Sequence, residues 1–187
     1  MTSMTTVTLW LVRHAQPQVA RGVCYGHTDM RAEPEATQIC AEALAKVLPA
    51  GIVGATSTLQ RCEQLTQSLL GLRPDLVINP NPQLREMNFG QWEGRVWNEI
   101  PRAELDAWTA NFADYAVGHS GESVARFMSR VALAFDALPT TQDTLWVTHA
   151  GVIRAVQLLA RGQRQVTQAD QWPIEAPAYG QWCKLRL

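Results

Sequence analysis

Two histidines of this chain each follow a short apolar segment, and the first has an arginine beside it. Arg13 and His14 come at the end of the segment 7–12, and His149 comes directly after the segment 145–148. Apolar segments of this length are typical of buried strands, so we expect both histidines at strand ends. A neutral imidazole is a competent nucleophile toward phosphorus, and a guanidinium presents a planar fork to phosphate oxygens. The pattern therefore indicates phosphoryl-transfer chemistry.

Three further residues complete a candidate site for a phosphate group. Arg61 comes shortly after the strand-like segment 52–56 and can present a second guanidinium. Gly151 follows His149 where a helix is expected to begin, and the N–H groups and dipole of a helix N-terminus favour an anion. Glu86 lies in a turn-rich segment after a third expected strand. It is the best placed carboxyl group to give the leaving alcohol its proton.

These residue types suggest a division of roles. His14 would attack phosphorus, with its far ring nitrogen held as a donor by a backbone carbonyl. His149, protonated or as a hydrogen-bond donor, would join Arg13 and Arg61 in offsetting charge on the phosphoryl oxygens. Gly151 would let the backbone approach the anion closely, because it has no Cβ.

Each candidate also has an ordinary structural interpretation. Arg13 would then be a surface charge, His14 a hydrogen-bonded core histidine, and Glu86 an ion-pair partner of Arg85 or another arginine. Arg61 would be a solvated residue of a first helical turn. That turn is a poor place for a cation, however, because it lies beside the positive end of the helix dipole. The position of Arg61 therefore favours an anionic partner.

The order of hydrophobic patterns predicts alternating strands and helices. Nearly continuous apolar segments predict strands at 7–12, 52–56, 76–78 and 144–148, and polar–apolar alternation predicts an edge strand at 181–187. Apolar residues at helical spacing predict helices at 36–47, 59–70, 124–138 and 152–159. We expect Gly71 and Pro74 to end the second helix, a turn at 79–82, and Ser120 or Ser123 to cap the third. Such alternation is typical of an α/β three-layer sandwich with a largely parallel central sheet, which binds ligands at the carboxyl ends of its strands.

Composition narrows the class of protein. The chain has 187 residues, of which 47% are hydrophobic, and we expect one domain over 1–187. A formal net charge of −1 gives no broad basic field for nucleic acid or an anionic membrane. The apolar runs are too short to span a bilayer, and residues 1–6 lack the basic segment of a secretion signal. Four scattered cysteines predict mostly buried, reduced thiols in a cytoplasmic protein; a zinc site is the alternative, although nothing pairs them locally (Cys24, Cys40, Cys62 and Cys183).

The motif Leu11-Val-Arg-His-Ala15 resembles the Arg-His signature of the histidine phosphatase superfamily, with Ala15 where many members carry Gly. Matching segments run from residue 8 to about 155. The resemblance implies a phosphoglycerate-mutase-like fold and a phosphohistidine on His14, with no metal or other cofactor. It also implies a phosphate pocket and a proton donor formed by Arg13, Arg61, His149 and Glu86.

Three segments resemble the α-ribazole-5′-phosphate phosphatase branch of that superfamily: 22–29, 86–94 with Trp97, and 121–123. In the first, His27 and Thr28 are candidate substrate contacts, and a loop turn is their alternative interpretation. Residues 30–33 depart from the apolar-Pro-Leu stretch usual in that branch, and Arg31 and Glu33 would change the mouth of the pocket. The chain has little room for the insertion of the mutases, which favours hydrolysis over mutase activity.

We therefore expect a cytoplasmic, metal-independent phosphomonoesterase that acts on a small phosphorylated metabolite. The first candidate substrate is α-ribazole 5′-phosphate, of cobalamin nucleotide-loop assembly. A phosphohistidine protein phosphatase, a phosphoglycerate-mutase-type enzyme and a regulatory protein that only binds a phosphorylated ligand are the alternatives. A mere binder needs neither the nucleophile nor the acid.

The expected partner is a phosphate ester rather than nucleic acid or membrane, and a homodimer is an option without an identified interface. Trp92 and Trp97 are expected in core or lid packing, with stacking on a substrate ring as the alternative, and His119 in an exposed loop.

Overall fold

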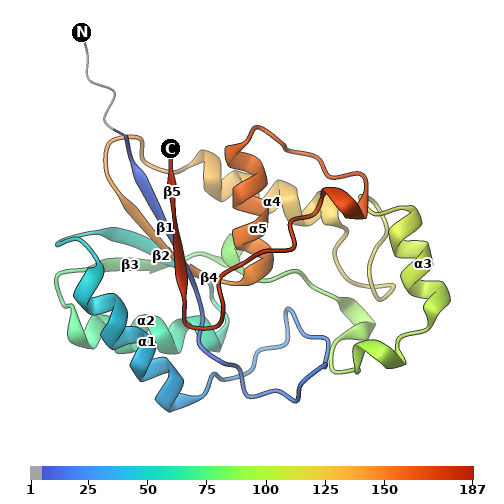
Figure 1. Ribbon diagram of the computed structural model, residues 1–187, viewed down its shortest axis with the longest axis horizontal. Coiled ribbons are helices and arrows are strands. Elements are labelled where there is room, and N and C mark those ends of the chain that lie inside the picture. Colours follow the sequence, from blue (N-terminus) through green and yellow to red (C-terminus); the bar gives the residue numbers. More distant parts are fainter. Residues whose placement is uncertain (1–5) are drawn as a thin grey trace, which may run out of the picture.

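The computed structural model describes residues 6–187, so the expectation about a secretion signal at the start of the chain lies almost wholly outside it. The described residues form a five-stranded sheet in the order β3-β2-β4-β1-β5 (Figure 1). The strands β1 to β4 run parallel, and β5 joins β1 antiparallel at one edge. Their bounds are Thr8–Arg13, Val53–Thr56, Val77–Pro80, Thr144–Thr148 and Trp182–Arg186. The predicted α/β class with a largely parallel sheet is confirmed.

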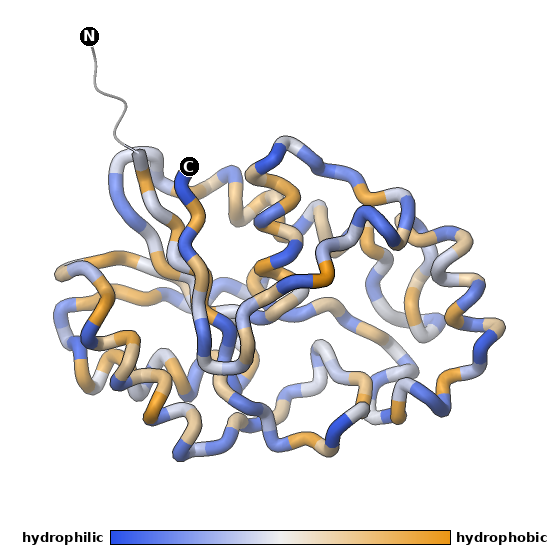
Figure 2. Tube along the Cα trace, viewed as in Figure 1, coloured by the Kyte–Doolittle hydropathy of each residue, from blue (hydrophilic) through white to orange (hydrophobic). Residues whose placement is uncertain are grey.

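Helices cover both faces of the sheet, as a three-layer sandwich requires. Helices α1 (Pro34–Val47) and α2 (Gln60–Leu72) pack on one face, and α4 (Val124–Asp136) and α5 (Ala150–Ala160) pack on the other (Figure 1). Polar and apolar residues alternate along these helices in Figure 2, because each turns one face to the sheet and the other to solvent. A further helix, α3 (Arg102–Ala110), lies away from the sheet.

Alternation along β1 divides the core into two clusters. Leu9 and Leu11 point into the cluster that contains residues of α4 and α5, and Trp10 and Val12 point into the cluster with α1 and α2. Successive side chains of a strand project to opposite faces of a sheet. Since both faces of this sheet are covered, β1 has to be apolar at every position, which is why its sequence is a continuous apolar run.

Several element boundaries differ from the sequence prediction. Helix α2 continues through Gly71 to Leu72, and β3 includes Asn79 and Pro80, where a turn was expected. A proline is tolerated there because β3 is an edge strand that pairs only with β2 among the described strands. Helix α3 was not predicted; none of its residues is fully buried, and Leu105 and Trp108 are its partly buried side chains that pack against the core.

The register of β1 against β4 brings the two histidine segments together. Arg13 pairs with Thr148, so His14 and His149 leave the sheet at adjacent positions. The His14 N–H donates to the carbonyl of Thr148 at 3.0 Å, and the Ser57 N–H, just after β2, donates to that of Val147 at 2.9 Å. The loops that follow β1, β2 and β4 therefore begin at one edge of the sheet.

Two further expectations concern the cysteines and the length of the apolar helices. Cys24, Cys40 and Cys62 are buried thiols and Cys183 is partly buried, as expected. No helix within residues 6–187 combines the length and the apolar character that crossing a bilayer would require.

The role of β1 in the core can be tested with a pair of leucines. Leu11 is fully buried, whereas Leu133 on α4 is 64% exposed. We expect Leu11→Ala to lower the free energy of unfolding by about 3 kcal/mol, because it removes buried methyl groups and leaves a cavity. Leu133→Ala should change it by less than about 0.5 kcal/mol. Urea denaturation measures both, and equal losses would contradict this description of the core.

Candidate active site

His14 is buried at the end of β1 with its ring fixed on one side by the backbone. Its Nδ1 lies 2.7 Å from the carbonyl oxygen of Ala15, a contact in which Nδ1 can only donate. The other ring nitrogen, Nε2, then keeps its lone pair. It accepts a 3.3 Å hydrogen bond from Nε of Arg61. The backbone carbonyl expected beside His14 is therefore present, as that of Ala15, and Nε2 faces the guanidinium of Arg61.

Arg61, near the start of α2, is fully buried, so the interpretation as a solvated residue is wrong. Its two terminal nitrogens donate to the carbonyls of Thr28 at 2.9 Å and Gly26 at 2.7 Å. Across residues 6–187, no carboxylate forms an ion pair with it. A buried cation held only by neutral groups carries a desolvation cost that a bound anion would offset.

His149, at the N-cap of α5, lies beside His14, with the two ring centroids 5.0 Å apart. Its Nε2 lies 2.8 Å from the hydroxyl of Ser57, while its Nδ1 is buried and finds no partner among the described residues. An orphaned buried nitrogen next to the candidate nucleophile has hydrogen-bonding capacity left for a ligand.

Both imidazoles are held in the neutral form. Burial, followed by the nearby charge of Arg61, keeps the pKa of His14 well below its ordinary value. The same two causes, together with His14 itself, lower the pKa of His149. A neutral His14 has the lone pair that a nucleophile needs. Of the two forms considered for His149, the neutral hydrogen-bonding one is therefore favoured in the ligand-free protein.

Arg13 reaches the same place from the end of β1. It donates to the carbonyl of Pro177 at 3.0 Å, and its guanidinium carbon lies 3.9 Å from the ring centre of Tyr179. The Tyr179 hydroxyl lies 2.5 Å from that of Tyr25. Two tyrosines from opposite ends of the chain thus flank the arginine, and the ring of Tyr179 also lies 5.6 Å from that of His14.

Glu86 caps helix α5 instead of pairing with its neighbour. Its Oε2 accepts from the N–H of Gly151 at 2.9 Å and its Oε1 from that of Met87 at 3.0 Å. The side chain of Arg85 donates to Thr58, so the interpretation of Glu86 as its ion-pair partner is wrong. A Cβ at residue 151 would lie 2.2 Å from Oε1, which explains the glycine. The anion that Gly151 approaches closely is therefore the Glu86 carboxylate.

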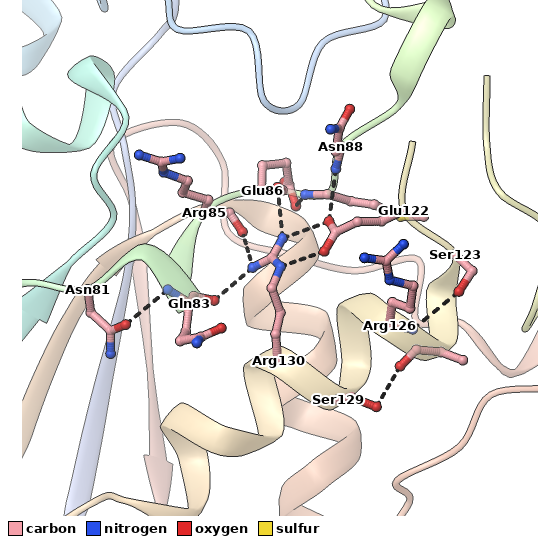
Figure 3. Close-up of polar contacts among 12 residues, drawn as sticks. Asn81, Gln83, Arg85, Glu86, Asn88, Glu122, Ser123, Arg126, Ser129 and Arg130 are labelled. Carbon is pink, nitrogen blue, oxygen red and sulfur yellow. Dashed lines mark hydrogen bonds and ion pairs between the residues drawn. The ribbon is translucent and has the colours of Figure 1, made fainter. Parts of the chain in front are cut away.

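Arg130, on α4, fixes the segment that carries Glu86 (Figure 3). The guanidinium of Arg130 donates to the backbone carbonyls of Gln83 and Arg85, each at 2.8 Å, and of Glu86 at 3.0 Å. It also forms a two-point ion pair with Glu122, at 2.7 and 2.9 Å. Three carbonyls bound to one partly buried cation leave the backbone around Glu86 little freedom to move.

A cavity of about 240 Å³ opens over His14, and we call it the active-site cavity. Its lining includes Arg13, His14, Tyr25, Glu86, Trp97 and Arg154. Arg61 and His149 are fully buried and contact His14 or lie beside it. Arg13, His14 and Glu86 thus line one small space, and Arg61 and His149 lie directly beside His14.

His27 and Thr28 do not line this cavity. Their backbone N–H groups, and the Thr28 hydroxyl, donate to the carboxylate of Glu93. The carbonyl of Thr28 in turn accepts from Arg61. The loop-turn interpretation fits these contacts better than direct contact with substrate. Trp92 is fully buried in the core, whereas Trp97 lines the cavity.

Sequence reasoning missed Arg154 and Tyr179. Arg154 lies one helical turn after Ala150 on α5, so its spacing from His149 was a usable signal. Tyr179 lies in the segment before β5, far along the chain from Arg13, and nothing in its local sequence indicates the contact. Ser123 is the residue that caps α4, as one of the two alternatives predicted.

The chain belongs to the histidine phosphatase superfamily. Residues 9–186 match the family model described as histidine phosphatase superfamily (branch 1). The class of enzyme is therefore a phosphoric monoester hydrolase, and its substrate class is the small phosphate ester.

Individual relatives carry more than one name. The chain is 30% identical over 157 residues to the adenosylcobalamin/α-ribazole phosphatase of Salmonella typhimurium, covering 78% of this chain and 75% of that protein. It is 27% identical over 164 residues to "Putative phosphoserine phosphatase 2" of Hydrogenobacter thermophilus, covering 82% and 78%. The crystal structure of TTHB049 from Thermus thermophilus superimposes with a TM-score of 0.71 at 27% identity, covering 97% of this chain and 99% of that one.

The lowered pKa values make stability depend on pH. The folded-state pKa values of His14 and His149 lie below the ordinary value of 6.5, so below pH 6.5 the unfolded chain binds more protons than the folded one. The free energy of unfolding should therefore fall as the pH drops, by about 1 kcal/mol per histidine between pH 7.5 and 5.5. Urea denaturation at the two pH values measures this difference.

Variants assign that pH dependence to the site. His149→Gln should reduce the difference by about a third to a half, since it removes one of the three histidines whose pKa is lowered in the folded protein, His14, His27 and His149. Leu133→Ala, at a 64% exposed position on α4, is the control and should leave the difference in place. The assignment is wrong if His149→Gln keeps the full dependence of the natural protein.

Proposed function

We propose that this chain is a metal-independent phosphomonoesterase that works through a phosphohistidine on His14. The observation that carries the proposal is the free Nε2 of a neutral histidine, in contact with Arg61 and lining a cavity that also holds Arg13 and Glu86. Guanidinium groups supply the positive charge that phosphoryl transfer needs at the transition state.

In the first step, Nε2 of His14 attacks phosphorus as the bond to the leaving oxygen breaks. Glu86 gives a proton to that oxygen, and the alcohol departs. In the second step, Glu86 takes a proton from water, whose oxygen attacks the phosphohistidine, and the P–N bond breaks to give inorganic phosphate. Arg13, Arg61 and His149 hold the phosphoryl oxygens in both steps.

The proposed roles of the remaining predicted residues are indirect. Gly151 acts through Glu86, because its N–H holds that carboxylate and its missing Cβ makes room for it. His27 and Thr28 belong to the loop whose carbonyls hold Arg61 and whose N–H groups bind Glu93. The single domain, the cytoplasmic location and the homodimer stay predictions.

For the substrate we propose α-ribazole 5′-phosphate as the first candidate. Support comes from two relatives named adenosylcobalamin/α-ribazole phosphatase, at 30% and 28% identity. Because another relative is named for phosphoserine, kcat/KM should be ranked over α-ribazole phosphate, phosphoserine, 3-phosphoglycerate and a phosphohistidine protein. A higher kcat/KM for any other member of this panel would replace the first candidate.

The covalent step is tested with His14→Ala. The natural protein should hydrolyse p-nitrophenyl phosphate in the presence of EDTA, and the variant should lose activity by about a thousandfold or more, since the nucleophile is gone. Rapid quenching during turnover should trap an acid-labile, base-stable phosphate on the protein. A fully active His14→Ala variant, or turnover with no trapped phosphate, would overturn the mechanism.

The role of Glu86 is tested by the quality of the leaving group. Glu86→Gln should slow alkyl phosphates about a hundredfold or more, because an alkoxide needs a proton, and slow p-nitrophenyl phosphate far less. Glu99→Gln, an exposed residue elsewhere, serves as the control with unchanged kcat/KM for both. Equal losses on the two esters would remove Glu86 from the role of acid.

A further inference from the structure

A second cavity, of about 410 Å³, lies against the active-site cavity. The two share Glu86, Phe89 and Arg154 in their linings. We call the second one the aromatic cavity, because rings of Phe89, Trp108, Phe112, Phe127 and Trp172 line it. Its volume is that of a small-molecule binding site.

The walls of the aromatic cavity come from five parts of the chain, and three of them supply most of its rings. Trp108, on α3, stacks on Phe112 with ring centres 5.4 Å apart, and Phe127, on α4, lies 6.2 Å from Trp172. The charged residues of its lining are Glu86 and Arg154, both on the wall shared with the active-site cavity. The aromatic cavity is therefore apolar away from the active site and charged at the wall that it shares with the active-site cavity, which we call the junction.

The order of residues across the two cavities matches the path of the reaction. His14 lines the active-site cavity but not the aromatic one, and Glu86 lines both. In phosphoryl transfer the leaving oxygen lies roughly in line with the nucleophile, on the far side of phosphorus. A leaving oxygen that is protonated by Glu86 therefore directs the rest of its group past Glu86, into the aromatic cavity.

We propose that the aromatic cavity binds the leaving group and selects phosphate esters whose alcohol carries a flat aromatic ring system. This inference rests on the proposed function, because it takes the places of nucleophile and acid from it. Aromatic side chains pack on flat rings by offset or edge-to-face contacts, which add to the burial of apolar area. A small polar alcohol, such as glycerol or serine, would leave those walls uncovered.

Arg154 is suited to form hydrogen bonds with the polar part of the substrate that lies between the phosphate and the ring. Its guanidinium is half-buried at the junction and donates one hydrogen bond, to the carbonyl of Ile174 at 2.8 Å. Its Nε is buried and has no partner among residues 6–187. An arginine carries five N–H donors, so several stay available for hydroxyl or ether oxygens of the alcohol.

An apolar residue at the rim of the aromatic cavity is exposed to solvent. Ile174 lines the cavity and is 90% exposed, the highest exposure of any large hydrophobic side chain in the described region. The backbone carbonyl of Ile174 accepts the hydrogen bond from Arg154, so this hydrogen bond links the rim to the junction. A ring bound in the cavity would cover this side chain and gain from its desolvation.

Two primary alkyl esters with similar leaving alcohols test the proposal: 2-(1-naphthyl)ethyl phosphate and glycerol 3-phosphate. The natural protein should favour the naphthyl ester in kcat/KM by about tenfold or more, the selectivity of an apolar pocket. Trp172→Ala should lower the ratio of the two kcat/KM values about tenfold, and Ile174→Glu about threefold. Ile39→Glu is the matched control, since Ile39 is 61% exposed on α1, and it should leave the ratio unchanged.

The outcomes separate this inference from the proposed function. Hydrolysis of both esters with equal kcat/KM, or a ratio that neither variant changes, overturns the aromatic cavity as the leaving-group site while the phosphatase stands. Hydrolysis of neither ester counts against the phosphatase, and the cavity is then tested by calorimetric titration with 2-(1-naphthyl)ethanol. Binding that weakens in Ile174→Glu, whose exposed position does not affect folding, supports the cavity, and no binding overturns it.

Discussion

A buried positive charge without a carboxylate partner is the constraint on which this active site depends. Arg61 has no exposed surface, and it is held by two backbone carbonyls and the lone pair of His14. Burying an ionised group costs several kcal/mol unless it is compensated, and carbonyl dipoles compensate only in part. The same charge, added to burial, keeps both imidazoles neutral. One guanidinium thus prepares the nucleophile and leaves the site in need of an anion.

The loops around the sheet are organised to hold such charges in place. The carboxylate of Glu93 gathers the N–H groups of His27, Thr28 and Phe89, and the loop that it fixes supplies the carbonyls that bind Arg61. On the other side, Arg130 and Glu122 fix the backbone at Glu86. Each reacting group is therefore supported by a charged residue that does not itself face the active-site cavity. Support of this kind limits the reorganisation that a reaction would otherwise require.

The proposed chemistry and the proposed selectivity are assigned to different parts of the fold. The histidines and arginines come from the ends of β1 and β4 and the start of α2, positions that the sheet fixes. The aromatic cavity shares the 86–89 segment and α5 with the active site, but most of its rings come from the region of α3, from α4 and from the segment before β5, which lie outside the sheet. Segments of that kind can change without disturbing the core.

The sequence by itself determined the sheet, the helices that cover it and the residues proposed to carry the chemistry. Its signals were local: an apolar run fully buried on both faces predicts a parallel strand, and Arg13-His14 or His149 at the end of such a run has to lie at the ligand-binding edge. Helix α3 was missed because its nine residues carry only two large apolar side chains, Leu105 and Trp108, which are too few to mark an apolar face. Only the tertiary structure decided that Glu86 caps α5, that Tyr179 covers Arg13 and that an aromatic cavity adjoins the site. Those contacts join residues far apart in the chain, and their geometry depends on how loops pack after the sheet has formed, which no local pattern records.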